Sequence, residues 1–142
     1  MTGLVLGQDK IIEIAAIITD QDLNPLDPRG FERVIHCPEN RMKSMGEWCT
    51  EQHAKVTSPS KNIMIDAKSG LTARVLASQN TAKSVEQELL DYIARYVPPG
   101  EGYLAGHCVY VDRDFMRYEF PRVIDHLHWR LIGSLPLENL LI

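Results

Sequence analysis

The chain has 142 residues, of which 44% are hydrophobic and 24% are charged, as in an ordinary globular protein large enough for a real core. Its net charge of -4 argues against a large footprint on duplex nucleic acid, which usually makes a domain basic. A small site for a short nucleic acid stays open, because a bound metal ion can supply positive charge. No apolar run approaches the roughly 20 residues of a membrane span. The three cysteines lack the regular spacing of a disulfide framework, so we expect an intracellular, reducing compartment.

The first predicted element is a strand over residues 11–19. Apolar residues occupy both of its faces, which is typical of a strand covered on both sides in an α/β sheet. Glu13 is the exception, and we expect it to be tied to a nearby Lys or Arg. Residues 19–25 have the composition of a turn, so Asp20 and Asp22 are interpreted as turn residues rather than as a metal pair.

A second strand is predicted over residues 31–36, antiparallel to the first if the turn between them is a hairpin, and a helix is predicted over residues 43–55. The helix is indicated by Met42, Met45, Trp48 and Cys49, which recur at helical spacing. Cys49 and His53 share a face of this helix, but no second Cys/His pair has a spacing typical of zinc sites. Residues 56–68 are polar and rich in turn formers, and we interpret them as an exposed loop.

A long amphipathic helix is predicted to start at a capping box formed by Ser84 and Gln87. Residues 98–100 (Pro-Pro-Gly) end it. A short strand over residues 103–105 then breaks at Gly106, and a second helix follows with Asp112 near its start. The apolar side of this helix consists of Phe115, Met116, Tyr118 and Phe120. A short helix from Pro121, a strand over residues 128–132 and an apolar tail over residues 133–142 complete the chain.

Asp112 is the strongest candidate for a metal-binding or catalytic residue. An acid in the first turn of a helix is stabilised in its ionised form by the helix dipole. A carboxylate at a junction of strand, loop and helix suits a divalent cation that prefers oxygen ligands. The alternative, which the local pattern favours, is that Asp112 and Asp114 are ordinary first-turn acids.

Five motifs in chain order resemble the oligoribonuclease family, 3'-to-5' exoribonucleases of the DEDD superfamily with a ribonuclease H-like fold. They are residues 1–4 with 9–15, 45–53, 68–72, 105–112 and 126–132. The resemblance implies a single α/β domain over residues 1–142, with a ribonuclease H-like mixed sheet flanked by helices. It also implies hydrolysis of short single-stranded RNA by acids that hold two Mg²⁺ or Mn²⁺ ions, with a histidine as general base.

The resemblance assigns roles to particular residues. Asp112 matches the acid of the family's second motif, which is a catalytic and metal-binding position. Leu4 matches a leucine that wedges against the terminal bases, and Trp48 and His53 match residues that line the dinucleotide pocket. Cys108 matches a position that contacts the 5' phosphate, where the family usually has a serine. Trp129 and Arg130 match an aromatic–arginine pair that closes over the same phosphate. In the family this pair reaches a partner subunit, which implies a homodimer.

The chain also departs from the family pattern. The family's first acid pair, Asp-x-Glu, lies just before the segment that matches residues 1–4, and its histidine and last acid lie beyond the segment that matches Trp129 and Arg130. We therefore expect that the chain is truncated at both ends. Of the family's catalytic acids Asp112 remains, so we expect hydrolysis of RNA to be impaired. Residues 56–68 are extra, which we interpret as an inserted loop encoded by a retained intron, and residues 133–142 are a divergent tail.

Three functions follow from this comparison. The first is an exoribonuclease by descent, with Mg²⁺ or Mn²⁺ as cofactor and a mitochondrial or cytoplasmic location that the sequence does not resolve. The second is a remnant that binds RNA or nucleotides, or dimerises, without catalysis. The third is an unrelated α/β domain in which Asp112 only stabilises a helix terminus, and the order of the motifs argues against it.

Overall fold

The computed structural model describes residues 1–53 and 70–134. The strands are β1 (Glu13–Ala16), β2 (Phe31–Val34), β3 (Leu104–His107) and β4 (Leu131–Ser134). The helices are α1 (Glu39–Lys43), α2 (Glu47–His53), α3 (Leu71–Ala77), α4 (Ala82–Ala94), α5 (Val109–Glu119) and α6 (Pro121–His126). This arrangement confirms the predicted α/β fold class.

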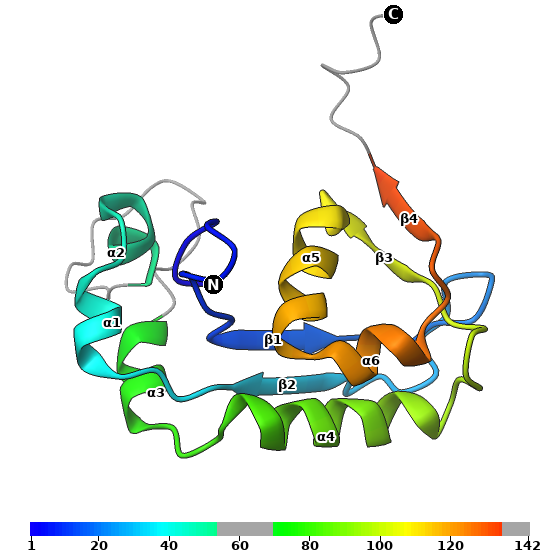
Figure 1. Cartoon of the computed structure of the whole chain (residues 1–142). Coiled ribbons are helices and arrows are strands. Elements are labelled where there is room, and N and C mark those ends of the chain that lie inside the picture. Colours follow the sequence, from blue (N-terminus) through cyan, green and yellow to red (C-terminus); the bar gives the residue numbers. More distant parts are fainter. Residues whose placement is uncertain (54–69, 135–142) are drawn as a thin grey trace, which may run out of the picture.

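The strands form two separate two-stranded sheets in the part of the chain that is described (Figure 1). β1 pairs antiparallel with β2, as the sequence predicts, and β3 pairs parallel with β4. A two-stranded sheet is marginally stable alone, so each pair depends on what packs against it.

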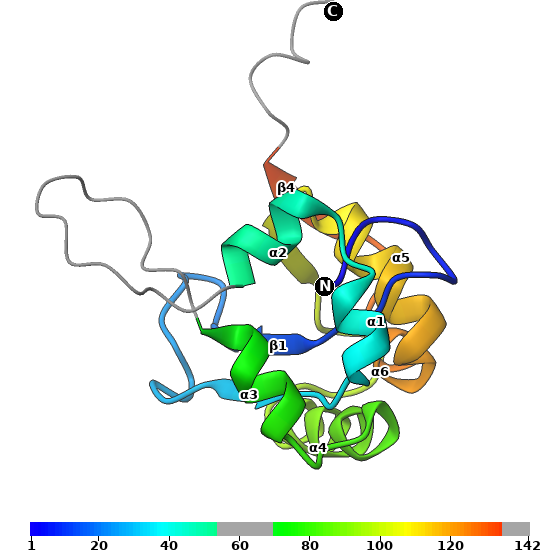
Figure 2. The same cartoon turned by 90° about the vertical axis from the view of Figure 1, so that its left-hand side faces the viewer.

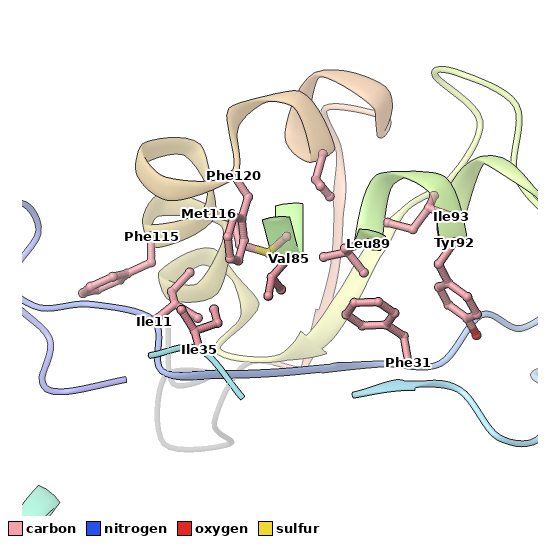
Figure 3. Close-up of a cluster of buried hydrophobic side chains, with 11 residues drawn as sticks. Ile11, Phe31, Ile35, Val85, Leu89, Tyr92, Ile93, Phe115, Met116 and Phe120 are labelled. Atoms are coloured by element: carbon pink, nitrogen blue, oxygen red, sulfur yellow. The ribbon is translucent and has the colours of Figure 1, made fainter. Parts of the chain in front are cut away.

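A layer made of α4, α5 and α6 supports both sheets (Figure 1). The main core lies between this layer and the strands, and Figure 3 shows side chains from β2, α4 and α5 that meet there. Its buried members are Ile11, Phe31, Ile35, Val85, Leu89, Tyr92, Ile93, Phe115, Met116, Phe120 and Val123. One continuous core therefore joins two sheets that share no hydrogen bond between described strands.

A second, smaller core includes residues of α1 and α3. These helices lie beside the start of β1 and the end of β2, at the left of Figure 1. The buried members of this core are Ile12, Cys37, Met42, Met45, Leu71 and Val75. Helix α3 was not predicted, because the matched motif around Gly70 had no periodic apolar stripe long enough to indicate a helix. Leu71 and Val75, four residues apart, provide its buried face.

Helix α4 is the longest element, and its apolar stripe is as predicted at Val85, Leu89 and Ile93. The predicted capping box was wrong by three residues. Thr81 is the N-cap, and its Oγ1 accepts a hydrogen bond from the Ser84 amide at 3.1 Å. The hydroxyl of Ser84 in turn accepts from the Thr81 amide, so Ser84 holds the inner position of the box rather than the outer one.

Several predicted boundaries differ from the structure. The first strand is shorter than residues 11–19, and Ala15 and Ile17 are exposed, so the described residues cover β1 on one face instead of two. Of the helix predicted over residues 43–55, Lys43 is the last residue of α1, a turn follows before Gly46, and α2 covers Glu47–His53; residues 54 and 55 lie outside the described ones. Tyr118 is exposed and does not belong to the buried face of α5.

The last two strands are also shifted along the chain. β3 runs through Gly106 to His107 instead of breaking at Gly106, and β4 begins at Leu131, so Trp129 lies before it. The predicted loop over residues 56–68 lies outside the described residues, as does the tail from residue 135 onward. No helix among the described residues is long and apolar enough to cross a membrane.

Candidate active site

A cavity of about 330 Å³ lies between β1 and β3, above α4 and α5. Both strands line it along their whole lengths, and the side chains of Leu89, Ile93, Phe115 and Met116 lie among its lining residues. Two carboxylates, Glu13 from β1 and Asp112 from α5, also line it. The cavity therefore combines an apolar interior with acidic groups, which is the general character of a binding site for a partly polar ligand.

The turn between β3 and α5 positions Asp112. Cys108 is the N-cap of α5 and adopts a left-handed conformation with φ of 51°, which turns the chain sharply from the strand into the helix. Asp112 then falls in the first turn of α5, as predicted. Burial by neighbouring groups raises the pKa of its carboxyl, and the positive charge of the Met1 amino group opposes that rise. The Met1 amino group is therefore a cation that partly offsets the desolvation of this carboxylate.

Met1 brings several candidate residues together. Its amino group has a lowered pKa because it is buried, and the negative groups of Cys49, Glu13 and Asp112 partly offset that effect. The ring Nε2 of His53, at the end of α2, lies 3.2 Å from the Met1 carbonyl oxygen. The start of the chain is thus placed between α2 and α5, and Figure 2 shows it near the centre of the molecule.

Glu13 is held by an ion pair, as the sequence predicts. Its Oε1 accepts a hydrogen bond from Nη1 of Arg74 in α3 at 3.0 Å. Nη2 of the same arginine donates to Glu32 on β2 at 2.6 Å. One arginine therefore bridges two neighbouring strands, and Glu13 already has a cationic partner.

Trp48 and Leu4, two of the predicted substrate-binding residues, are strongly exposed. Trp48 on α2 is 71% exposed and Leu4 is 72% exposed. Leu4 lies in a loop fixed by Asp9, whose Oδ1 accepts from the Thr2 hydroxyl and whose Oδ2 accepts from the Val5 amide, both at 2.8 Å. Large apolar side chains held in solvent by an ordered loop or helix suit contact with a ligand or partner.

Trp129 and Arg130 lie at the other end of the parallel pair from Asp112. They precede the amino end of β4, whereas Asp112 follows the carboxyl end of β3. At about 3.3 Å per residue the strands alone separate these positions by roughly 10 Å. The arginine guanidinium lies 4.9 Å from the Trp129 ring centroid, which is a cation–π arrangement.

This aromatic group extends beyond the predicted pair. The ring of His128 stacks on Trp129 at 5.5 Å between centroids, and Tyr103 packs against His128 at 4.6 Å between centroids. Sequence reasoning missed the contribution of Tyr103, because it is distant in sequence and carries no motif. It likewise missed Met1 and Arg74, whose roles depend entirely on tertiary contacts.

The described residues do not form a complete site for two divalent cations. No group of three or more His, Cys, Asp or Glu side chains able to hold a metal gathers within residues 1–53 and 70–134. Glu13 is occupied by Arg74, which leaves Asp112 as the available carboxylate of the cavity. Two ions about 4 Å apart need more oxygen ligands than one carboxylate supplies.

Residues 1–135 match the family model described as "Exonuclease". An oligoribonuclease from Francisella tularensis subsp. novicida is 34% identical over 140 residues, and the match covers 99% of this chain and 71% of that protein. The chain belongs to the oligoribonuclease family of exonucleases. The family assignment that the five sequence motifs predicted is therefore confirmed.

Other relatives of this exonuclease family are longer. The mitochondrial oligoribonuclease of Saccharomyces cerevisiae is 48% identical over 139 residues, covering 93% of this chain and 47% of that protein. A probable oligoribonuclease of Schizosaccharomyces pombe is 40% identical over 141 residues, covering 99% of this chain and 50% of that protein. The chain thus spans about half the length of these curated relatives.

Proposed function

We propose that this chain acts in the 3'-to-5' degradation of short oligoribonucleotides, as part of an exoribonuclease. The observation that carries the proposal is the position of Asp112. It follows the carboxyl end of β3, faces a cavity, and belongs to a chain matched by an exonuclease family model over residues 1–135. Carboxylates at the ends of strands are well placed to meet a phosphate through a divalent cation.

The exposed aromatic residues support a single-stranded substrate. Trp48 lies on α2, whose last residue His53 contacts Met1 at the cavity. We propose that a base stacks on Trp48 while a phosphate is bound at the Asp112 end of the cavity. Stacking is tolerant of base identity, which suits an enzyme that degrades RNA without sequence preference.

The position of Trp129 and Arg130 favours a homodimer. The pair is separated from Asp112 by the length of β3 and β4, which supports a role for the pair at a site other than the one formed by Asp112 of its own chain. An exposed tryptophan with a stacked guanidinium is well suited to close over a phosphate presented by a partner subunit. We propose that each subunit contributes this pair to its partner.

Mg²⁺ or Mn²⁺ is the proposed cofactor, and Asp112 is the one described residue to which we assign it. Because the described residues supply too few free carboxylates for two ions, we further propose that residues 1–142 alone hydrolyse RNA poorly. The mitochondrial and bacterial relatives favour action in mitochondria or cytoplasm.

The direct test is incubation of the purified chain with a labelled diribonucleotide and Mn²⁺, with and without a chelator. We expect binding but little turnover. Turnover that is lost in Asp112→Ala and kept in Asp22→Ala, a control acid in the exposed turn, would support the assignment of Asp112 and contradict the proposed impairment. Turnover unaffected by Asp112→Ala would contradict the assignment itself.

A second function, binding of short RNA without catalysis, is favoured by the same incomplete acid set. Fluorescence anisotropy with the labelled diribonucleotide tests it. Trp48→Ala is expected to weaken binding roughly 5- to 150-fold, because one stacked base contributes about 1–3 kcal/mol. Trp48→Phe keeps an aromatic face and is expected to retain most of the affinity. Equal affinities of both variants would argue against stacking on this residue.

A further inference from the structure

A second cavity, of about 380 Å³, lies between α4 and the segment that joins β1 to β2. Arg29, Phe31 and Arg33 are among the residues that line it from the joining segment and from β2, and α4 lines it from the other side. Of the nine described residues in its lining, six are charged, three of them arginines and three of them acids. None of the nine also lines the cavity of Asp112, so this is a separate place on the molecule.

Tyr92 of α4 lines this second cavity, and its buried hydroxyl has no hydrogen-bond partner among the described residues. The residue is 7% exposed, and its ring packs against Phe31 and Tyr96, both at 5.6 Å between centroids. Figure 3 shows the hydroxyl pointing away from Leu89 and out of the apolar cluster. Asp27, which lines the same cavity, is close enough for its charge to act on this hydroxyl. Because an unpaired buried hydroxyl costs free energy, it calls for a partner on the cavity side.

The Tyr92 hydroxyl is a hydrogen-bond donor near neutral pH. Burial raises the pKa of this phenol above its ordinary value of 10.0, and the negative charge of Asp27 raises it further. The group therefore keeps its proton and stays neutral. Its missing partner is an acceptor, and an acceptor that also attracts the neighbouring cations satisfies the cavity best.

Two arginines of this cavity have guanidinium groups available to a ligand. Arg95 is exposed, is the C-cap residue of α4 and forms no ion pair with any described residue. Arg29 has a side chain that is 93% exposed, and its Nε lies 3.7 Å from Oδ1 of Asp27, which is too long for a hydrogen bond. The third arginine, Arg33, is already engaged, because its Nε donates to Oε2 of Glu88 at 2.7 Å.

The acids of the cavity already have donors. Oδ1 of Asp27 accepts from the Arg29 amide at 3.0 Å, and Oδ1 of Asp91 accepts from Nε2 of Gln87 at 2.8 Å. What is left over is a set of donors, namely two guanidinium groups and one phenol. A phosphate group has enough acceptor oxygens for all three, and guanidinium groups bind phosphate oxygens in pairs. The carboxylates oppose an anion by their charge, so tight contact with both guanidinium groups is needed to hold it.

We propose that this cavity is a second ligand site, which takes a small phosphate-bearing molecule between Arg29 and Arg95, with the Tyr92 hydroxyl as a third donor. The hydroxyl is covered before binding, so side chains at the rim shift when the ligand enters. Arg29 is free to make such a shift, because its side chain is almost fully exposed. The site excludes Asp112 and does not depend on the proposed exonuclease function.

The test titrates the complete 142-residue chain, labelled with ¹⁵N, and follows its NMR signals at constant ionic strength in the presence of a metal chelator. The probes are inorganic phosphate and phenyl phosphate, and acetate is the control anion. We expect saturable shifts at the amides of Gly30 and Tyr92 and at the Nε–H of Arg95. Saturation by inorganic phosphate alone identifies the free ion as the ligand, whereas saturation by both probes identifies a phosphomonoester.

Arg95→Gln is expected to weaken phosphate binding about tenfold or more, because it removes hydrogen bonds between charged groups. Tyr92→Phe keeps the ring but removes the hydroxyl, and we expect it to weaken binding about threefold or more. Lys83→Gln removes the same charge as Arg95→Gln from an exposed position in the first turn of α4, and it is the matched control. Asp112→Ala tests whether the two cavities are independent, and we expect it to leave the shifts unchanged.

Five results would each overturn the proposal. They are the absence of saturable shifts with either phosphate probe, acetate binding as tight as phosphate binding, and equal weakening by Arg95→Gln and Lys83→Gln. The others are unchanged affinity in Tyr92→Phe and loss of the shifts in Asp112→Ala.

Discussion

The contact between Glu86 and Arg122 gives the sharpest prediction about stability. Glu86 on α4 is 7% exposed, and its Oε1 accepts from the Arg122 backbone amide at 2.9 Å. Its Oε2 accepts from Nε and Nη2 of the same arginine, both at 3.2 Å. The Glu86 carboxylate thus accepts hydrogen bonds both from a backbone amide in the first turn of α6 and from the Arg122 guanidinium. These bonds fix α6 on α4.

Glu86→Ala is expected to lower the free energy of unfolding by about 2–3 kcal/mol. A hydrogen bond to a charged group contributes about 1.5–3 kcal/mol, and several bonds to one carboxylate do not add fully. The arginine side chain is 46% exposed, so water solvates it after the change and limits the loss. Glu86→Gln keeps an oxygen acceptor for the backbone amide and is expected to cost about 1 kcal/mol.

The assay is urea denaturation followed by circular dichroism, with Glu88→Ala as the matched control. Glu88 lies two residues further on the same helix and bonds Arg33 at 2.7 Å, but that ion pair is about half exposed. Exposed pairs contribute about 0.2–1 kcal/mol. A loss in Glu86→Ala no larger than the loss in Glu88→Ala would refute the reasoning that burial makes the Glu86 contact strong.

Three further predictions follow from local geometry and charge. Thr81→Ala removes the side-chain cap of α4 and should lower the unfolding free energy by about 1 kcal/mol in the same assay, whereas no loss would contradict the capping role. Gly30→Ala should cost more than Gly100→Ala, because both have positive φ but a Cβ at Gly30 would lie 2.9 Å from the Ala16 carbonyl oxygen; equal losses would contradict this. The lowered pKa of the Met1 amine means that the unfolded chain binds this proton more tightly, so stability should rise as pH increases toward the ordinary value of 8.0. Comparison with the N-acetylated chain isolates this effect, and identical pH profiles would contradict it.

Local sequence signals predicted the elements whose side chains follow a clear period. The stripe of Val85, Leu89 and Ile93 in α4 is an example, since its residues face one core and repeat every four positions. The antiparallel pairing of β1 with β2 was predicted on the condition that the turn after the first strand forms a hairpin. The prediction for Glu13 was correct because an acid among apolar strand residues requires a partner.

Tertiary context determined the features that the sequence did not predict. Met42, Met45, Trp48 and Cys49 have helical spacing, but the chain turns before Gly46, and Trp48 is exposed. A periodic pattern does not reveal where a helix is interrupted when both parts contribute to the same core. The gathering of Met1, His53 and Asp112 has no local signal, because these residues come from three separate segments. The separation of Trp129 from Asp112 depends on the parallel pairing of β3 and β4, which sequence spacing does not give.

Among the described residues β1 has a strand partner on one side alone, and its other edge has a consequence for the behaviour of the chain at high concentration. Unpaired backbone groups on one molecule can pair with those on another, and exposed Ile17 beside this edge adds apolar contact. Natural edge strands are usually protected by charge, proline or a covering segment. On β1 the exposed Ala15 carries no charge, and the charge of Glu13 is neutralised by Arg74. The net charge of -4 provides only modest repulsion between copies. Self-association through strand pairing should therefore increase with protein concentration and with salt, and in a cell such a chain would be a natural client of chaperones.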